Sequence, residues 1–282
     1  MDGKTVLVTG ASSGIGLATA SRLAALGAHV VMVSRTQPRG AKARAEILKA
    51  TPGASLDLLI ADLATTTAIR KLAEAFQRKY SRLDVLINNA AVLTSRRTLT
   101  PEGLEMQFCV NHLAYFLLTG LLLDVLRASE PSRVINVAST AHSRGVIDFD
   151  DLQFAEAYRG WQAYANTKLM NVLFTYELAR RLEGTRVTVN VLHPGVIHTN
   201  LLSNFSSVLQ LAWHAIGRWF KQPEDGAETP VYLAASPEVV SVSGKYFRYC
   251  KPLGTSAQSY DREIQRRLWK ESERLSGFAY PI

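Results

Sequence analysis

A short apolar run that passes through a glycine-rich turn into a helical pattern is the feature that most restricts the fold of this chain. Residues 5–8 are apolar and rich in β-branched side chains, as expected of a strand buried on both faces. The turn at residues 9–16 carries three glycines and opens a helical pattern that continues to Ala25. This order of strand, glycines and helix predicts a dinucleotide-binding unit.

Each glycine of the turn has a distinct expected role. Gly10 permits a tight turn, Gly14 lets the backbone approach a pyrophosphate, and Gly16 lets the helix lie close to the strand. The phosphates would then contact free N–H groups at the helix N-terminus. The Gly-x-x-x-Gly-x-Gly spacing differs from the more common Gly-x-Gly-x-x-Gly spacing.

The residues after the second expected strand, 29–33, indicate which dinucleotide is preferred. An NAD site usually has a carboxylate there, which accepts a hydrogen bond from the ribose 2′-hydroxyl. This chain has Ser34 followed by Arg35, with Arg39 close by. A guanidinium pairs with a 2′-phosphate, whereas a carboxylate would repel it. The sequence therefore predicts NADP(H) as the cofactor; the alternative is that Arg35 is an ordinary surface residue at a strand end.

Strand and helix patterns alternate along the rest of the chain, which predicts an α/β fold. With 282 residues, 47% of them apolar, and no internal repeat or linker-like run, one domain covering 1–282 is the simplest organisation. We predict a Rossmann-type, doubly wound parallel sheet with helices on both faces. The further expected strands are 56–61, 85–87, 133–137 and 187–192, and the further expected helices are 39–50, 105–126, one that carries Tyr164, and about 258–275.

Composition argues against several classes of protein. Two cysteines, Cys109 and Cys250, are too few for a disulfide framework, and no histidines have metal-ligand spacing. The net charge of +8 is dispersed, and its densest basic cluster, within 258–275, is interspersed with acidic residues as on a solvated helix face. No nucleic-acid-binding module is recognisable. We therefore expect neither a metal site nor a nucleic-acid partner.

The chain is expected to be soluble and cytoplasmic. Residues 1–4 lead directly into the first strand without a targeting pattern. The longest apolar run, 113–126, contains Asp124 and is too short to cross a bilayer of roughly 30 Å as a helix. Weak attraction to anionic membrane surfaces stays open.

Tyr164 and Lys168 are the most suggestive pair of chemical groups. Residues four apart lie on the same face of a helix, so the phenol and the ammonium would lie together. A free phenol has a pKa of roughly 10, and a nearby cation lowers it toward the range where general acid–base catalysis is efficient. The pair alone is weak evidence, because a solvated lysine beside a half-buried tyrosine is common on helices.

Polar residues near the ends of other expected elements have two interpretations each. Asp62 either accepts a hydrogen bond from an adenine amino group or caps the helix that begins near residue 66. Asn88 and Asn89 hold the strand ends, contact the cofactor, or both. Ser139 lies at the carboxyl end of a strand, where open α/β sheets bind ligands, but serine is also a common cap. Asn111 lies in an apolar helix and needs partners, because an unsatisfied amide costs about 1–3 kcal/mol.

Taken in order, these residues resemble the short-chain dehydrogenase/reductase family over nearly the whole chain. Within the family the chain is most similar to the retinol dehydrogenase-like branch, in the segments 110–119, 167–174, 192–196 and 242–247. It departs from many relatives at Ala91, where they have glycine. We also expect it to differ from many animal relatives in having no N-terminal membrane anchor, which would weigh against a membrane-bound retinoid role. The motif residues that carry the resemblance are Thr9, Gly10, Gly14, Ile15, Gly16, Asp62, Leu63, Asn88, Asn89, Ala90, Asn111, Ser139, Tyr164, Lys168, Pro194 and Gly195.

The resemblance implies an oxidoreductase that interconverts a carbonyl and an alcohol by hydride transfer. Tyr164 would transfer the proton, and Lys168 would lower the pKa of Tyr164 and hold the nicotinamide ribose. Ser139 would orient the carbonyl, and Asn111 would fix a water that links Lys168 to solvent. The implied cofactor-binding residues are Gly10, Ser12, Ser13, Gly14, Ile15, Gly16, Arg35, Asp62, Leu63, Asn89, Tyr164, Lys168, Pro194, Gly195, Ile197 and Thr199.

Residues 201–221 form an insertion where this family has its substrate lid. A narrow polar stripe at Gln210, His214, Arg218 and Lys221 leaves a wide apolar surface, which is either core packing or a wall over a substrate pocket. An apolar wall favours a lipophilic, retinal-like aldehyde or ketone as the substrate. Contact of this segment with a membrane surface is a third interpretation.

Two other functions and one assembly also stay open. Reduction of smaller polar carbonyls or 3-ketoacyl groups would suit a short, polar lid, which this segment is not. A non-catalytic NADP-binding scaffold or redox sensor would be expected to lack Tyr164, Lys168 or Ser139, and all three are present. The helices that begin near residues 105 and 160 either pair two copies into a homodimer or use their apolar faces inside the chain.

Overall fold

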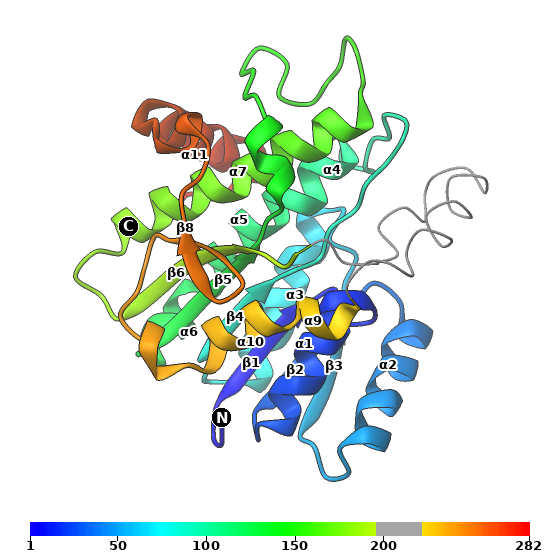
Figure 1. Cartoon of the computed structure of the whole chain (residues 1–282). Helices are drawn as coiled ribbons and strands as arrows, with labels where there is room; N and C mark the ends of the chain where they lie inside the picture. Colours follow the sequence, from blue (N-terminus) through cyan, green and yellow to red (C-terminus); the bar gives the residue numbers. More distant parts are fainter. Residues whose placement is uncertain (196–221) are drawn as a thin grey trace.

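A computed structural model describes residues 1–195 and 222–282. Within these residues, eight strands form one sheet in the order β3-β2-β1-β4-β5-β6-β7-β8 (Figure 1). Neighbouring strands are parallel except for the antiparallel pair β7–β8. The strand order reverses between β1 and β4, so the sheet is doubly wound. The predicted α/β Rossmann-type fold class is confirmed.

The expected strands agree with the observed ones to within one residue at each end. The strands are β1 (Thr5–Thr9), β2 (His29–Ser34), β3 (Leu56–Ile60), β4 (Val85–Asn88), β5 (Ser132–Val137), β6 (Val187–His193), β7 (Tyr246–Arg248) and β8 (Lys251–Leu253). The helices are α1 (Gly14–Ala25), α2 (Gln37–Ala50), α3 (Thr66–Lys79), α4 (Met106–Phe108), α5 (Ala114–Leu121), α6 (Leu123–Ala128), α7 (Gly160–Arg181), α9 (Pro223–Gly226), α10 (Glu228–Ala235) and α11 (Arg262–Ser276).

Helices cover both faces of the sheet, as predicted. Helices α1, α2, α9 and α10 lie on one face, and α3, α5, α6 and α7 lie on the other (Figure 1). Side chains alternate between the two layers, so Val6 and Val8 join the apolar cluster beneath α1, and Leu7 joins the cluster beneath α3 and α5. The central strands are therefore buried on both faces, which explains their continuous apolar runs.

The expected helix 105–126 is interrupted, which corrects the sequence prediction. It begins as α4, widens into a π-helical turn at Cys109–Leu113, continues as α5 and, after Leu122, ends as α6. Asn111 lies in the π-helical turn, where its Oδ1 accepts a hydrogen bond from the Val92 N–H at 2.7 Å. Its Nδ2 donates to the Val92 carbonyl at 2.9 Å and to Thr167 Oγ1 at 3.2 Å. In this turn the buried side-chain amide of Asn111 has its hydrogen-bond partners, and two of its bonds connect it to the segment after β4.

Two helix starts also differ from expectation. Asp62 does not cap α3; Thr65 does, because its side chain accepts a hydrogen bond from the Ala68 N–H at 3.2 Å. Helix α11 begins at Arg262, later than expected, because Asp261 caps it and accepts from the Glu263 N–H at 2.8 Å. The residues just before it form a separate 3₁₀ turn, Ala257–Tyr260.

A buried chain of polar side chains connects the middle of the sheet to α5 and α7. Asn88 Nδ2 donates to Asn136 Oδ1 at 2.9 Å and to Thr119 Oγ1 at 3.0 Å. Asn136 Nδ2 in turn donates to Thr175 Oγ1 at 2.9 Å. Of the roles considered for Asn88, holding the strand end is therefore the one observed.

Helix α11 packs on α7 and completes the apolar layer that α5 and α7 form. The centroid of the Trp269 ring lies 5.1 Å from that of Phe116 and 4.6 Å from that of Tyr280. The Arg181 guanidinium lies 4.2 Å from the Trp269 centroid, a cation–π contact. The apolar faces of α5 and α7 are thus used inside the chain. In the two described ranges, no helix is both long enough and apolar enough to pass through a bilayer.

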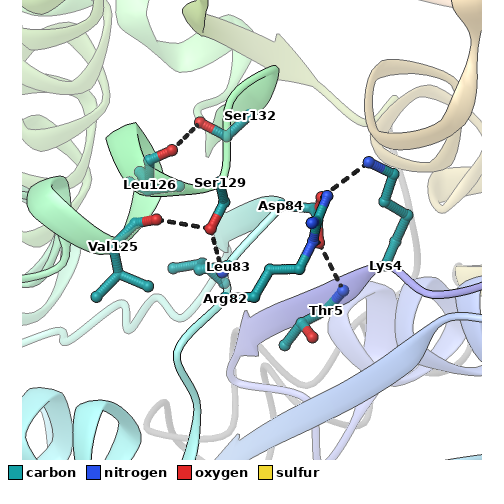
Figure 2. A network of polar contacts seen from close by, with 9 residues as sticks. All are labelled: Lys4, Thr5, Arg82, Leu83, Asp84, Val125, Leu126, Ser129 and Ser132. Carbon is teal, nitrogen blue, oxygen red and sulfur yellow. Dashed lines mark hydrogen bonds and ion pairs between the residues drawn. The ribbon is translucent and has the colours of Figure 1, made fainter.

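Asp84, at the amino-terminal edge of the sheet, is buried in a cluster of donors (Figure 2). Its carboxylate accepts hydrogen bonds from Lys4 Nζ at 2.9 Å, from Arg82 Nη2 at 2.6 Å and Nε at 2.7 Å, and from the Thr5 N–H at 2.9 Å. Burial alone would raise the pKa of Asp84, but these hydrogen bonds outweigh it and leave that pKa lowered. The carboxylate therefore joins the starts of β1 and β4.

Candidate active site

A cleft of about 320 Å³ lies at the carboxyl-terminal edge of the sheet, where parallel strands place ligands. It runs from the turn after β1, past the end of β2, to the N-terminal half of α7. Most of the predicted cofactor-binding residues line it together. These residues are Gly10, Ser12, Ser13, Gly14, Ile15, Gly16, Arg35, Asp62, Leu63, Asn89, Tyr164, Lys168 and Pro194.

The glycine turn has the backbone geometry that a pyrophosphate site needs. Gly10 and Gly14 have φ values of 66° and 55°, in the left-handed region that favours glycine. A Cβ at Gly16 would collide with the Gly10 carbonyl and the Asn89 amide, so only glycine lets α1 start this close to β1. Ser13, the N-cap of α1, makes no capping hydrogen bond with its side chain. Free N–H groups at this helix end fit an anionic pyrophosphate.

Asn89 both holds the strand ends and lines the cleft, as the sequence allowed. Its Nδ2 donates to the Thr9 carbonyl at 2.8 Å. Thr9 Oγ1 accepts from the Asn89 N–H at 2.9 Å and from the Ala90 N–H at 3.1 Å. These bonds join the carboxyl ends of β1 and β4. Ala91, the departure from the family pattern, also lines the cleft.

The far end of the cleft, beside β2, is lined by basic side chains and one exposed carboxylate. Ser34 is buried and its Oγ donates to the Thr36 carbonyl at 3.0 Å. Arg35 and Arg39 are exposed, and neither forms an ion pair within residues 1–195 and 222–282. Asp62 accepts a hydrogen bond from the Ala64 N–H at 3.1 Å and stays exposed at the cleft. This end therefore offers two unpaired guanidinium groups and one acceptor.

The other end of the cleft holds Tyr164 and Lys168 on one face of α7. Both side chains are buried, and Lys168 Nζ lies 5.5 Å from the centroid of the Tyr164 ring. The ammonium donates a hydrogen bond to the Val137 carbonyl at 2.9 Å, at the end of β5. Within the described residues it has no acidic partner. A buried charge with one neutral partner is uncommon outside functional sites.

Burial shifts the pKa values of both groups. It lowers the pKa of the Lys168 ammonium to about 7. It raises the pKa of the Tyr164 phenol to about 12, although a hydrogen bond with Ser139 acts in the opposite direction. The expected lowering of the Tyr164 pKa by Lys168 is therefore not the net effect in the protein alone. At neutral pH the phenol keeps its proton, and the buried ammonium loses its proton more readily than an exposed lysine does.

Ser139 follows β5 and begins a 3₁₀ turn, Thr140–Arg144. Its Oγ accepts a hydrogen bond from the Ala141 N–H at 3.2 Å, so it is a cap. The same side chain forms the hydrogen bond that acts on the Tyr164 pKa, so it also reaches the candidate catalytic group. Ser139 and Asn111 do not line the cleft itself. Asn111 instead reaches the site through Thr167, next to Lys168.

Several of the predicted site residues lie outside the described part of the chain. Ile197, Thr199 and the expected lid at 201–221, with Gln210, His214, Arg218 and Lys221, lie outside the described residues. Gly195 is described and has a φ of 103°, but it does not line the cleft.

Sequence reasoning missed Tyr115, a neighbour of the candidate catalytic pair. The Lys168 ammonium lies 5.7 Å from the Tyr115 ring centroid, so it lies near two tyrosine rings. Tyr115 is fully buried, its hydroxyl has no hydrogen-bond partner among the described residues, and burial raises its pKa. Its spacing of four from Asn111 was the available signal. Val92, Met106 and Val110 also line the cleft and were not predicted.

The arrangement defines a particular class of protein. The sheet is doubly wound, the glycine turn suits a pyrophosphate, and one cleft holds a buried phenol and a buried amine. These features are typical of an α/β oxidoreductase that uses a dinucleotide cofactor. Comparison with known proteins agrees: the model of the short chain dehydrogenase family matches residues 4–209. The chain belongs to this family, whose members interconvert carbonyls and alcohols.

Relatives and solved structures extend this result over nearly the whole chain. Retinol dehydrogenase 14 of Homo sapiens is 45% identical over 293 aligned positions, which cover 98% of this chain and 87% of that protein. A crystal structure of a protein from Mycobacterium paratuberculosis is 33% identical, with a TM-score of 0.81, covering 100% of this chain and 96% of that one. A short chain dehydrogenase from Burkholderia cenocepacia, solved in complex with NADP, is 28% identical, with a TM-score of 0.69 over 87% of this chain and 96% of that one. The resemblance to retinol dehydrogenases is thus confirmed.

Proposed function

We propose that this chain is an NADP(H)-dependent oxidoreductase that interconverts a lipophilic aldehyde or ketone and its alcohol, acting as one catalytic domain. The observation that carries the proposal is that one cleft has unpaired guanidinium groups at one end and Tyr164 with Lys168 at the other. These two ends suit the 2′-phosphate and the reacting end of one dinucleotide. When bound, the nicotinamide supplies or accepts the hydride.

The adenosine end supports NADP(H) over NAD(H). Arg35 and Arg39 line the cleft beyond β2 and have no acidic partner in the described ranges. A guanidinium pairs with a phosphate through two parallel hydrogen bonds. The complex of the Burkholderia relative with NADP is consistent with this preference. Asp62 is free to accept a hydrogen bond from the adenine amino group, since Thr65 caps α3.

The residues at the other end have distinct roles. Tyr164 donates its proton to the carbonyl oxygen in reduction and accepts one from the alcohol in oxidation. The pKa of about 12 keeps the phenol protonated at neutral pH, which favours the proton-donating role. Lys168 binds the nicotinamide ribose and, when charged, stabilises the phenolate. Ser139 orients the carbonyl by a hydrogen bond, and Asn111 positions the water next to Lys168.

The lipophilic substrate class rests on the relatives. The curated relative at 45% identity is a retinol dehydrogenase, and retinol is a long apolar alcohol. Smaller polar carbonyls and 3-ketoacyl groups are the second candidate. A panel of propanal, an acetoacetyl thioester and retinal, each with NADPH and with NADH, separates the two candidates. We expect the highest kcat/KM for retinal with NADPH; no turnover of any carbonyl would contradict the proposal.

Cofactor choice is tested by Arg35→Asp. We expect roughly 10- to 100-fold weaker binding of NADPH, because a charge-assisted pair is lost and a repulsive carboxylate is added. NADH binding should change little. Arg44→Asp is the matched control, since Arg44 is an exposed residue of α2 that does not line the cleft. Quenching of protein fluorescence by each dinucleotide measures both affinities, and equal affinities in the parent protein would exclude this role for Arg35.

A further inference from the structure

Trp161 is an exposed aromatic residue that touches the candidate catalytic tyrosine. It lies one helical turn before Tyr164 on α7, so the two side chains share a face. The ring centroids are 6.1 Å apart, and the ring planes are nearly perpendicular at 86°. Trp161 is nevertheless 56% exposed. A large apolar ring therefore stands in solvent directly beside the group that would transfer the proton.

The backbone beneath Trp161 is firmly held. The Gly160 carbonyl accepts a hydrogen bond from Gln107 Nε2 at 3.0 Å. A Cβ at Gly160 would collide with the Thr94 carbonyl, so this residue packs tightly against the segment after β4. Tyr158, just before the helix, lies 2.6 Å from Thr94 through their hydroxyl groups. The exposure of Trp161 is thus a property of an ordered helix start and not of a frayed end.

A second exposed aromatic residue, which packs against the same helix from the 3₁₀ turn before α11, provides a contrast. Tyr260 is 54% exposed and stacks on Tyr176 of α7, with centroids 5.5 Å apart. Its hydroxyl accepts a hydrogen bond from the Thr255 N–H at 3.0 Å, so Tyr260 holds the segment before α11. Within residues 1–195 and 222–282, no hydrogen bond of the Trp161 side chain joins two segments in this way. Its ring contacts Tyr164, and more than half of the residue's surface is exposed.

We propose that Trp161 is a specificity-determining residue that binds the apolar part of the substrate next to the carbonyl held by Tyr164. An indole ring offers a large rigid apolar surface, which suits an unsaturated or aromatic chain better than a short polar one. Because Trp161 adjoins Tyr164, a long chain attached to a carbonyl within hydrogen-bond reach of the phenol would extend over the indole, whereas a chain as short as that of propanal has little surface to place there. This inference rests on the proposed function and specifies which residue selects the lipophilic substrate.

The test compares Trp161→Ala, Trp161→Phe and Tyr260→Ala with the parent protein, using propanal and retinal with NADPH. For Trp161→Ala we expect kcat/KM for retinal to fall on the order of tenfold, mainly through KM, because apolar surface is lost from a binding contact. Turnover of propanal and binding of NADPH should be nearly unchanged. Trp161→Phe should retain most of the retinal activity, and Tyr260→Ala should retain the parent ratio of the two substrates.

The outcomes are separable. If Trp161→Ala lowers kcat for both aldehydes equally, the residue supports Tyr164 and does not select substrate, and the inference is overturned. An unchanged retinal-to-propanal ratio in a parent-like Trp161→Ala enzyme overturns it as well. Should the parent itself show no preference for retinal, the proposed substrate class fails, and the Trp161 inference fails with it.

Discussion

Two buried charges lie at opposite edges of the same sheet, and their surroundings differ. The Asp84 side chain, 2% exposed at the amino-terminal edge, accepts hydrogen bonds from two cationic side chains and one backbone N–H (Figure 2). Lys168, 1% exposed at the carboxyl-terminal edge, has within the described residues a single hydrogen bond, to a carbonyl. The pKa of Asp84 is lowered, toward the charged form, whereas the pKa of Lys168 is lowered toward the neutral form.

This difference distinguishes a charge that stabilises the fold from one that is suited to ligand binding or proton transfer. A compensated buried carboxylate joins β1 to β4 and is stable as an anion. An uncompensated ammonium costs stability, and such a cost is typical of sites that bind a ligand or transfer a proton. We therefore expect substitutions at the amino-terminal edge to change stability and those at the carboxyl-terminal edge to change activity.

The largest expected effect is on turnover in Tyr164→Phe. Loss of the hydroxyl removes general acid–base catalysis, which typically contributes 10²–10⁴-fold, or about 3–5 kcal/mol of the barrier. Folding and NADPH binding should persist. Steady-state kinetics with retinal, corrected for the folded fraction by circular dichroism, measure the loss. Activity within a few-fold of the parent would mean that another group transfers the proton.

Next in size is the loss of stability in Asp84→Asn. Asp84 is buried, but its partners Lys4 and Arg82 are partly exposed, so the substitution removes charge-assisted hydrogen bonds without leaving a buried cation. We expect the free energy of unfolding to fall by about 2 kcal/mol at pH 7. The stabilisation is present above the unfolded pKa of 3.8 and is lost as the pH falls through the lower folded pKa, so the variants should converge in acid. Urea unfolding at several pH values measures this. Kinetic constants of the folded variant should match the parent; a large fall in kcat would break the proposed division between the two edges.

A smaller effect of opposite sign is expected for Lys168→Met. The folded pKa of about 7 lies below the unfolded value of 10.5, so the unfolded chain binds more protons between these values and the parent gains stability as the pH rises from 7 to 10.5. The methionine variant should be more stable than the parent by about 1–2 kcal/mol at pH 6 and should lose that advantage above pH 10. Its turnover should collapse. A variant less stable than the parent at pH 6 would show that the ammonium is compensated after all.

The smallest effect is expected for Tyr115→Phe. Its hydroxyl is buried without a partner in the described part of the chain, so removing it should raise the free energy of unfolding by about 1 kcal/mol or less. Thermal unfolding measures the gain. A loss of stability would show that this hydroxyl forms a hydrogen bond, so that Tyr115, like Asp84, would stabilise the fold through its polar group.

Features that depend on local chemistry were predictable from the sequence. The apolar runs and the glycine turn predicted β1, α1 and the cleft. Gly10 is needed for its left-handed backbone and Gly16 for close packing, and both needs arise within one short stretch of sequence. The pairing of Tyr164 with Lys168 followed from helical spacing alone.

Features that depend on distant residues were not predictable. Periodicity cannot reveal the π-helical turn at Asn111, whose amide forms two hydrogen bonds with Val92, 19 residues earlier in the chain. The raised pKa of Tyr164 likewise results from tertiary burial, which outweighs the effect expected of the lysine. The cluster around Asp84 joins residues from the starts of two separate strands, and no local pattern marks it.

The position of α11 has a consequence for how the protein behaves on dilution. Because Trp269 packs against Phe116 of α5 and Phe174 of α7 from within the same chain, no second chain is needed to shield these rings. Because α11 is covalently connected to α5 and α7, its effective concentration near them is fixed and does not fall when the protein is diluted. Specific activity should accordingly stay constant as the enzyme is diluted, as far as these two helices are concerned.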